Sequence, residues 1–403
     1  MSAEALRAQK EEEEGTAQKL GSVFRGGEVS IRGNVAALDE ANVKLIKTFG
    51  ASSISELVKV PDFYTFKNEL IVSHRDFDKY YSRLLSGEKS AIVSGLNPSA
   101  TIHIGHIPVF DTNLFFQQKH GVEVFIPFSD DESYVSLKIK TQEEGLRYAL
   151  QLTRSMLAYG FDVKKTHVII DQIYTDIYNL AIKLSRSITM SEVKSVYSYT
   201  NDQNTGLHFY PAIQSAHVVL PNQFGMSNVL VPIGPDEDAH LRICRDIANR
   251  FKYDKPAVLH SRFLPGVDGE KMSKSRGNAV FFLDPAKEVK RKIMSAFSGG
   301  RETVEEHRRL GGNPDVDVAY MYLKSYFLTS EDAKQLNADY RKGKILSGEM
   351  KKMLLDKVQE RIDDFQHKYE KVTEGDIEKV IMRNEDVDLK SLIEKSGAFS
   401  TRK

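Results

Sequence analysis

Two histidines three residues apart, His103 and His106, flank Gly105 at the end of the segment S-A-I-V-S-G-L-N-P-S-A-T-I-H-I-G-H, residues 90–106. Imidazole N–H groups can donate hydrogen bonds to phosphate oxygens on which negative charge develops during a reaction. A glycine between them leaves no side chain in the way of a nucleotide. The spacing predicts a phosphate-binding turn; two ordinary surface or core histidines near a helix start are the alternative.

The loop of residues 265–278 is rich in small, hydroxylic and cationic residues, among them Lys271, Met272, Ser273 and Lys274. Lysine carries a compact charge on a flexible stem, so the two lysines could follow the phosphate chain of a bound nucleotide as it is cleaved. We therefore predict a mobile cationic clamp, with a lysine- and serine-rich surface loop as the alternative.

Acidic clusters at residues 129–132 and 236–238 each follow a predicted strand. Ligands of open parallel sheets bind beyond the carboxyl ends of the strands, so both clusters are aimed at a site. The second cluster suits ribose hydroxyls or an ammonium group, whereas the first could also be a solvated loop or helix cap. Between the clusters, Phe209, Tyr210 and Gln214 could form an aromatic-walled pocket or plain core.

Alternating strands and helices must position these residues. Apolar runs predict strands at residues 91–93, 122–128, 167–170 and 229–233, and helical spacing predicts helices from about residue 105, over 143–159, 174–196 and 239–251. Strands that alternate with helices predict an α/β protein with a Rossmann-like parallel sheet.

The chain divides into four predicted segments. Residues 1–25 are charged and poor in large apolar residues, so we expect disorder there. Residues 26–87 are expected to form an N-terminal helical subdomain, with helix over 35–70, and residues 88–284 the Rossmann-like catalytic domain. Residues 285–403 lack a strand pattern and contain a candidate long helix at 348–372, which predicts an α-helical domain.

Composition places few limits on function. The 403 residues carry a net charge of zero, so no global field indicates a polyanionic partner. Cys244 is the only cysteine, which excludes an intramolecular disulfide framework and favours a buried thiol in a reducing compartment. No apolar run approaches transmembrane length, and four glutamates at residues 11–14 argue against a targeting peptide, so we expect a cytoplasmic protein without a membrane partner.

Taken together, H-I-G-H at 103–106 and K-M-S-K-S at 271–275 resemble the signature pair of class I aminoacyl-tRNA synthetases. The block at 296–318, with the segments at 206–214 and 234–245, is similar to the tryptophanyl-tRNA synthetases of the archaeal and eukaryotic type. This resemblance covers the chain from about residue 74 to residue 372.

The resemblance implies an ATP-dependent ligase that activates tryptophan as an aminoacyl-adenylate and transfers it to the 3′ end of tRNA(Trp). ATP would arrive as its Mg²⁺ complex, so no dedicated protein metal site is expected. The resemblance further implies that the helical C-terminal domain binds the anticodon and that the protein is a homodimer.

It also implies roles for individual residues. The catalytic set is His103, His106, Lys271 and Lys274. The ATP-binding set adds Gly95, Asn97, Gly105, Asp236, Met272 and Ser273. The amino-acid-binding set is Val93, Ser129, Glu132, Phe209, Gln214 and Glu237.

The amino-acid pocket departs from the family pattern. In this family a tyrosine on the first strand and a glutamine on the second usually bond the indole N–H, but Val93 and Pro127 stand there, and Glu237 replaces a glutamine. A buried N–H without a partner costs about 1–3 kcal/mol. Either another acceptor serves the indole or the amino acid is not tryptophan, so a tyrosine-specific relative and a non-catalytic synthetase-like regulator stay open as alternatives. Lys274 replaces an alanine common in this branch but restores the general class I pattern.

Overall fold

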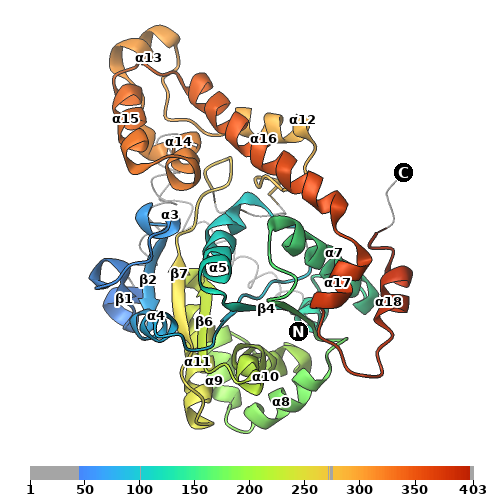
Figure 1. Ribbon diagram of the computed structural model, residues 1–403. Coiled ribbons are helices and arrows are strands. Elements are labelled where there is room, and N and C mark those ends of the chain that lie inside the picture. Colours follow the sequence, from blue (N-terminus) through green and yellow to red (C-terminus); the bar gives the residue numbers. More distant parts are fainter. Residues whose placement is uncertain (1–44, 100, 271, 273–275, 400–403) are drawn as a thin grey trace, which may run out of the picture.

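The computed structural model describes residues 45–99, 101–270, 272 and 276–399. Its centre is a seven-stranded sheet in the order β1-β2-β7-β6-β3-β4-β5 (Figure 1). The strands are β1 (Ser52–Ser53), β2 (Ile71–Arg75), β3 (Ser90–Val93), β4 (Glu123–Phe128), β5 (Thr166–Ile170), β6 (Asn228–Ile233) and β7 (Ala257–Ser261). The five strands from β7 to β5 are parallel, whereas β1 and β2 are antiparallel additions. The predicted Rossmann-like parallel sheet is confirmed.

The order of the strands determines where in the sheet the site lies. From β3 the chain moves outward through β4 to β5, and later from β6 to β7 on the other side of β3. Strand order therefore reverses between the neighbouring strands β3 and β6, and the carboxyl ends of two such strands leave a crevice for a ligand.

Side chains alternate between the two faces along each strand, and helices cover both faces of the sheet. In β4, Val124, Ile126 and Phe128 pack into the core with α4 (Phe77–Leu85), α5 (Ile107–His120) and α7 (Gln142–Tyr159). Phe125 points to the other face, which is covered by α8 (Asp176–Ser185), α10 (Thr205–Val219) and α11 (Asp238–Arg250). Burial on both faces explains why the strands read as nearly continuous apolar runs.

The predicted helices of the catalytic part follow local signals. Helix α5 starts after the short turn η2 (Ile104–His106), and α7 ends at Gly160, whose φ of 119° is the left-handed conformation that glycine favours. The remaining helices are α3 (Tyr64–Lys67), α6 (Asp130–Val135), α9 (Met190–Tyr197), α12 (Ala286–Met294), α13 (Val304–Leu310), α14 (Val318–Tyr322), α15 (Ser330–Arg341), α16 (Ser347–Lys371), α17 (Glu374–Val380) and α18 (Leu389–Ser396).

Two helix predictions are wrong in part. Residues 1–44 lie outside the described residues, but the rest of the 35–70 stretch contains β1 and only short helices, and β2 lies in the segment 26–87 that was expected to be helical. Strand β2 forms because its edge pairs with β7, a partner far along the chain. The helix expected at 174–196 is two helices, since Thr189 caps a new start by accepting a hydrogen bond from the Glu192 N–H. The division into domains itself stays a prediction.

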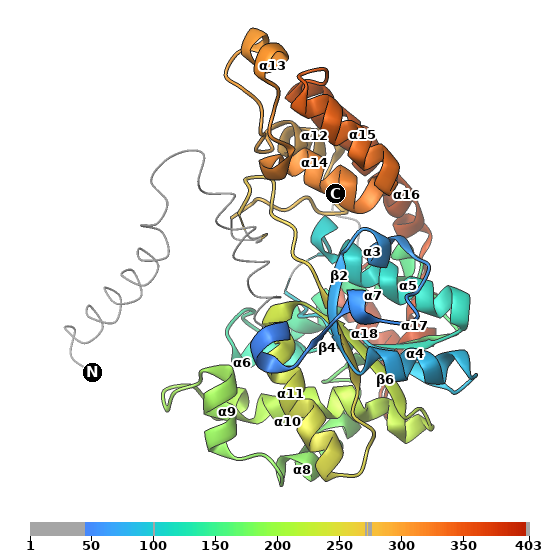
Figure 2. The same cartoon turned by 90° about the vertical axis from the view of Figure 1, so that its left-hand side faces the viewer.

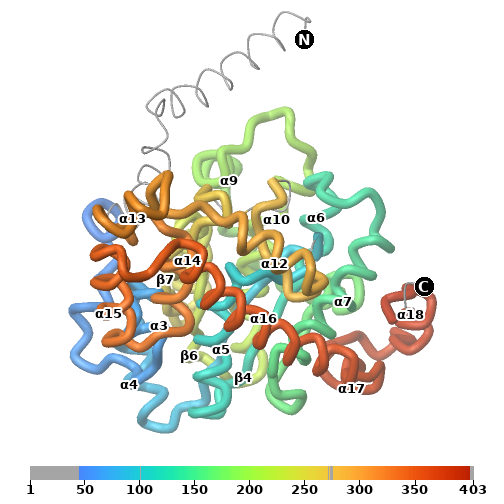
Figure 3. Tube along the Cα trace, turned by 90° about the horizontal axis from the view of Figure 1, so that it is seen from above, coloured from blue at the N-terminus to red at the C-terminus, as the bar shows by residue number. Residues whose placement is uncertain are grey.

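Helices α12 to α15 stand above the sheet, whereas α17 and α18 lie beside it (Figure 2). The long helix α16 runs across the top of the molecule toward α17 (Figure 3), and it buries Leu354, Val358, Ile362 and Phe365 in the same core as α5 and α7. Arg361 of α16 also pairs with Asp111 of α5 at 2.5 Å. Packing and charge therefore join the C-terminal helices to the catalytic sheet.

Among the helices in the described ranges, none is both long and apolar enough to cross a membrane. Cys244 is buried in α11, as its apolar neighbours in the sequence indicated.

Candidate active site

The histidine turn links the end of β3 to the start of α5. The Nδ1 atom of His103 accepts a hydrogen bond from the backbone N–H of Gly105 at 3.1 Å, and Nδ1 of His106 lies 3.1 Å from the backbone N of His103. Because Nδ1 of His103 is an acceptor, the proton of its neutral ring sits on Nε2. The turn therefore presents an N–H donor to the crevice at the carboxyl end of β3.

Both histidines are neutral near pH 7. Burial lowers the pKa of His106 to about 4, and burial together with the nearby His106 ring lowers the pKa of His103 further. The two ring centroids are only 4.0 Å apart, and the His106 ring stacks on Phe110 at 5.3 Å. A charged imidazolium is disfavoured here, so the neutral rings are suited to hydrogen bonding rather than to acid–base chemistry.

A cavity of about 260 Å³ opens in front of this turn. Its lining brings together six residues predicted to bind ATP, namely Gly95, His103, Gly105, His106, Asp236 and Met272. A Cβ atom on Gly105 would lie 2.9 Å from the His103 ring and 2.9 Å from Sδ of Met272. Only glycine therefore fits between the histidine turn and the lysine loop.

The base of the lysine loop is closed by hydrogen bonds. The N–H of Val267 donates to the carbonyl of Asn278 at 2.9 Å, and the Asn278 amide donates to Asp268 at 2.8 Å. Beyond this base, the N–H of Ile104 donates to the carbonyl of Val280 at 3.0 Å. The two motifs, far apart in the sequence, are thus joined through backbone pairing.

Four residues of that loop, Lys271, Ser273, Lys274 and Ser275, lie outside the described residues. Their predicted roles stay predictions.

The segment 296–318, which carries much of the family resemblance, supports the loop base. The N–H of Phe297 donates to the carbonyl of Val267 at 2.8 Å, and the N–H of Gly299 donates to the Asp317 carboxylate at 3.0 Å. Asp317 is fully buried. This segment therefore holds the lysine loop against the C-terminal helices.

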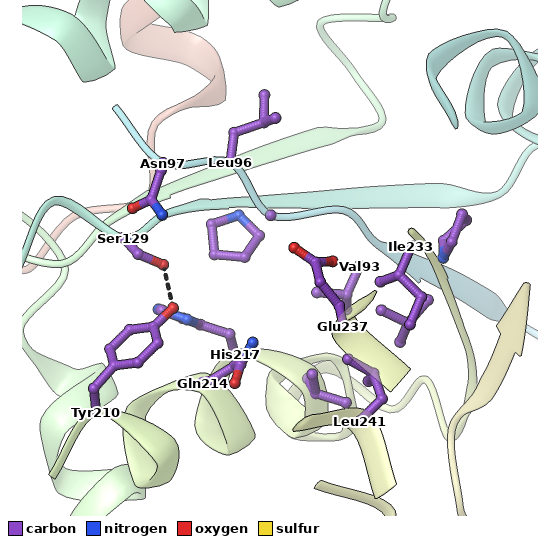
Figure 4. Close-up of a pocket in the computed structure, with 15 residues that line it drawn as sticks. Val93, Leu96, Asn97, Ser129, Tyr210, Gln214, His217, Ile233, Glu237 and Leu241 are labelled. Atoms are coloured by element: carbon purple, nitrogen blue, oxygen red, sulfur yellow. Dashed lines mark hydrogen bonds between the residues drawn. The ribbon is translucent and has the colours of Figure 1, made fainter. Parts of the chain in front are cut away.

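Figure 4 shows the residues that line a second, smaller cavity of about 110 Å³. The two share Gly95, Leu96, Pro232, Ile233 and Glu237 as walls, so they adjoin. The rest of the smaller cavity is lined by Val93, Asn97, Pro127, Ser129, Tyr210, Gln214, His217, Val218, Val231 and Leu241.

This lining contains Val93, Ser129, Gln214 and Glu237 of the predicted amino-acid-binding set. Asn97, predicted for ATP, lines only this cavity and accepts a hydrogen bond from the Ser133 hydroxyl at 2.8 Å.

Two predicted amino-acid-binding residues do not line either cavity. The Glu132 carboxylate pairs with Nζ of Lys138 at 2.9 Å, six residues along the same segment. Phe209 packs against the core between the sheet and α10. A sequence pattern could not show either contact, because Lys138 reaches Glu132 through the path of the chain after α6 and the surroundings of Phe209 depend on how α10 packs.

The acidic cluster after β4 is partly structural. Asp130 accepts hydrogen bonds from the backbone N–H of Asp171 at 2.8 Å and from the Gln172 amide at 2.5 Å, which fixes the chain after β5. Burial and the neighbouring Asp131 raise the pKa of Asp130 to about 6. In the described part of the chain, no group of three or more histidine, cysteine or carboxylate side chains could hold a metal ion.

Sequence reasoning missed His217, which lines the smaller cavity from α10. Its Nε2 lies 2.7 Å from Oδ1 of Asp171, and burial lowers its pKa to about 4. Tyr210, Gln214 and His217 are spaced by four and three residues, so they share one face of α10. That spacing was the signal in the sequence.

The sequence model of the family described as tRNA synthetases class I (W and Y) matches residues 85–363. That range contains the histidine turn, the lysine loop and the residues that line both cavities. The chain belongs to this family of class I tRNA synthetases. The family resemblance predicted from the sequence is thereby confirmed, and the synthetase is an enzyme by family.

Proteins of similar sequence match this synthetase over most of its length. It is 35% identical over 342 residues to the tryptophan–tRNA ligase of Sulfolobus acidocaldarius, covering 81% of this chain and 89% of that protein. It is 36% identical over 355 residues to the cytoplasmic tryptophan–tRNA ligase of Oryctolagus cuniculus, with 82% and 74% covered.

Solved structures give the same result. The tryptophanyl-tRNA synthetase of Aeropyrum pernix superposes with a TM-score of 0.78 at 30% identity, covering 85% of this chain and 96% of that one. The enzyme from Encephalitozoon cuniculi, solved bound to tryptophan, has a TM-score of 0.75 at 25% identity, with 85% and 97% covered.

Proposed function

We propose that this synthetase is a tryptophan–tRNA ligase: it joins tryptophan to ATP and passes the aminoacyl group to tRNA(Trp). The observation that carries the proposal is the pair of adjoining cavities in a chain that matches tryptophan–tRNA ligases over about four-fifths of its length. One cavity has the residues for a nucleotide, and the other has room and polar groups for an amino acid.

In the first step, a carboxylate oxygen of the amino acid attacks the α-phosphorus of ATP. A new C–O–P bond forms, the bond between the α-phosphorus and the bridging oxygen breaks, and pyrophosphate leaves with both electrons. The attacking carboxylate is already deprotonated, so the step needs positioning and charge stabilisation rather than a general base.

The residues divide these tasks. The N–H groups of His103 and His106 donate hydrogen bonds to the phosphate oxygens, and Lys271 and Lys274 follow the pyrophosphate as it leaves. Mg²⁺ arrives with ATP and neutralises charge on the phosphates. Asp236 lies where it can bond the ribose.

The polar end of the amino acid lies at the shared wall of the cavities. Glu237 lines both cavities, and Gln214 lines the smaller one, so a carboxylate and an amide hold the ammonium group there. The carboxylate of the amino acid then faces the nucleotide cavity. In the second step, a hydroxyl at the 3′ end of the tRNA attacks the carbonyl carbon of the adenylate, and AMP leaves.

The remaining partners follow from the family. Residues 285–403 bind the anticodon, where unpaired bases can be splayed and stacked. The working form is a homodimer. The enzyme acts in the cytoplasm, which is the location given in the names of two eukaryotic relatives.

The test is ATP–pyrophosphate exchange by the full-length protein with each amino acid in turn. We expect tryptophan to drive exchange and purified tRNA(Trp) to be charged. Exchange driven by tyrosine would show that the protein is the related tyrosine enzyme instead. That enzyme is the specific alternative because the side chains of Val93 and Pro127 cannot accept a hydrogen bond from the indole N–H. Binding of tryptophan without exchange would indicate a regulator.

A further inference from the structure

The smaller cavity poses a problem for tryptophan, on the assumption that the proposed function is correct. The indole ring has one polar atom, an N–H donor, and it needs an acceptor when buried. The side chains of Val93 on β3 and Pro127 on β4 carry none. The acceptor must come from another element that lines the cavity.

The wall that the two cavities share indicates which part of the lining meets the indole. The carboxylate of the amino acid must reach the nucleotide, so it lies near the shared wall of Gly95 and Glu237. The side chain therefore extends into the part that belongs to the smaller cavity alone. The polar side chains there are Asn97, Ser129, Tyr210, Gln214 and His217.

Four of these five groups already have partners that occupy their oxygen atoms. Oδ1 of Asn97 accepts a hydrogen bond from the Ser133 hydroxyl at 2.8 Å. The hydroxyls of Ser129 and Tyr210 lie 2.9 Å apart and bond each other, as the dashed line in Figure 4 shows. Oε1 of Gln214 accepts a hydrogen bond from the Tyr197 hydroxyl at 2.6 Å. Each of them would have to share an acceptor that is in use.

His217 differs from them. Its Nε2 lies 2.7 Å from Oδ1 of Asp171, and when that oxygen accepts the hydrogen bond the ring proton is on Nε2 and Nδ1 keeps a lone pair. Within the described ranges Nδ1 has no hydrogen-bond partner, and it is accessible rather than sealed in the core. The residue as a whole is only 3% exposed, so a ligand in the cavity would complete its burial.

We propose that Nδ1 of His217 accepts the indole N–H of tryptophan and that Asp171 positions the ring for it. The indole N–H, which lacks an acceptor, and Nδ1 of His217, which lacks a donor, then form one hydrogen bond. Recognition of the indole has moved from the strands β3 and β4, where the side chains are apolar, to the face of α10. His217 thus sets specificity, whereas Asp171 is a positioning residue.

The experiment compares tryptophan with 3-benzothienyl-alanine, in which sulfur replaces the indole N–H and the ring size is nearly unchanged. The chain contains no tryptophan, so the fluorescence of the added amino acid also reports its binding directly. In the wild-type protein we expect kcat/KM for exchange to favour tryptophan by about ten- to a hundredfold. In His217→Leu, we expect that ratio to fall to about one.

Tyr210→Phe is the matched control, because it removes another polar group on the face of α10 that carries His217. We expect it to keep the ratio, whatever happens to the absolute rate. Loss of the ratio in Tyr210→Phe and not in His217→Leu would overturn the proposal.

Two readouts do not depend on how well a variant folds. A wild-type ratio near one would overturn the proposal without any substitution. ¹⁵N NMR of histidine-labelled wild-type protein should show a His217 Nδ1 signal without a proton that moves when tryptophan is added; a protonated Nδ1 would also overturn it.

The outcomes separate this proposal from the proposed function. If tyrosine rather than tryptophan drives exchange, the proposed function fails and this proposal fails with it. If tryptophan drives exchange but His217→Leu keeps the ratio, only the assignment of His217 fails.

Discussion

Replacing Arg361 by methionine would test how the C-terminal helices are attached to the catalytic part. Nη2 of Arg361, on α16, lies 2.5 Å from Oδ1 of Asp111 on α5 and 2.7 Å from the Tyr159 hydroxyl. Asp111 also accepts hydrogen bonds from the hydroxyls of Tyr159 and Tyr64. Asp111 is five residues beyond His106, so this cluster connects α16 to the helix that starts at the histidine turn.

The expected loss follows from the burial of the pair. The Arg361 side chain is 29% exposed and the Asp111 side chain 11% exposed. Removal of one partner of a buried pair costs about 3–5 kcal/mol, because the other charge stays buried without compensation. Two phenol donors remain on Asp111 and Arg361 is partly hydrated, so we expect the lower end, about 3 kcal/mol.

The assay is urea unfolding followed by far-UV circular dichroism, with ATP–pyrophosphate exchange measured on the same samples. Lys357→Met is the control on the same helix, since Lys357 is 54% exposed and its partner Glu360 lies 3.9 Å away. We expect that control to cost no more than about 0.5 kcal/mol.

Asp111→Asn provides the decisive comparison. It removes the uncompensated charge, so in the Arg361→Met background it should restore part of the lost stability. The reasoning would be refuted if Arg361→Met were as stable as Lys357→Met, or if Asp111→Asn made the Arg361→Met protein still less stable.

Three further predictions concern the site. Gly105→Ala should abolish most exchange activity, because its Cβ would meet Met272 Sδ at 2.9 Å, whereas Gly348→Ala, where the added atom meets nothing within 4 Å, should leave exchange unchanged. Lys274→Ala should slow exchange about a hundredfold if the lysine stabilises the leaving pyrophosphate, and an unchanged rate would contradict that role. The pKa of His106 is lowered to about 4, so its contribution to stability is present above the unfolded pKa of about 6.5 and declines as pH falls toward 4. Between pH 7 and pH 5 the wild-type protein should therefore lose of order 2 kcal/mol more of its free energy of unfolding than His106→Gln. Equal losses in denaturant titrations would contradict the neutral state of that ring.

Much of the catalytic fold was predictable because its signals are local. The run at β4 and the helix α7 with Gly160 at its end depend on side-chain period and on one backbone conformation, both of which a short stretch of sequence carries. The antiparallel strand β2 was not predictable in this way. It forms because β7, which was itself missed, offers an edge for pairing.

The site shows the same difference between what local sequence signals determine and what depends on contacts made in the fold. By itself the sequence determined the histidine turn and the class of reaction, because Gly105 and its two histidines act within one turn of chain whose geometry their own backbone sets. Only the tertiary structure decided the surroundings of the amino acid. Lys138 pairs with Glu132 outside the cavities, while Asp171 orients His217 toward the smaller one. The use of a polar side chain depends on which groups approach it in the fold, from another element for His217 and from the chain just after its own helix for Glu132. The sequence pattern alone shows neither approach.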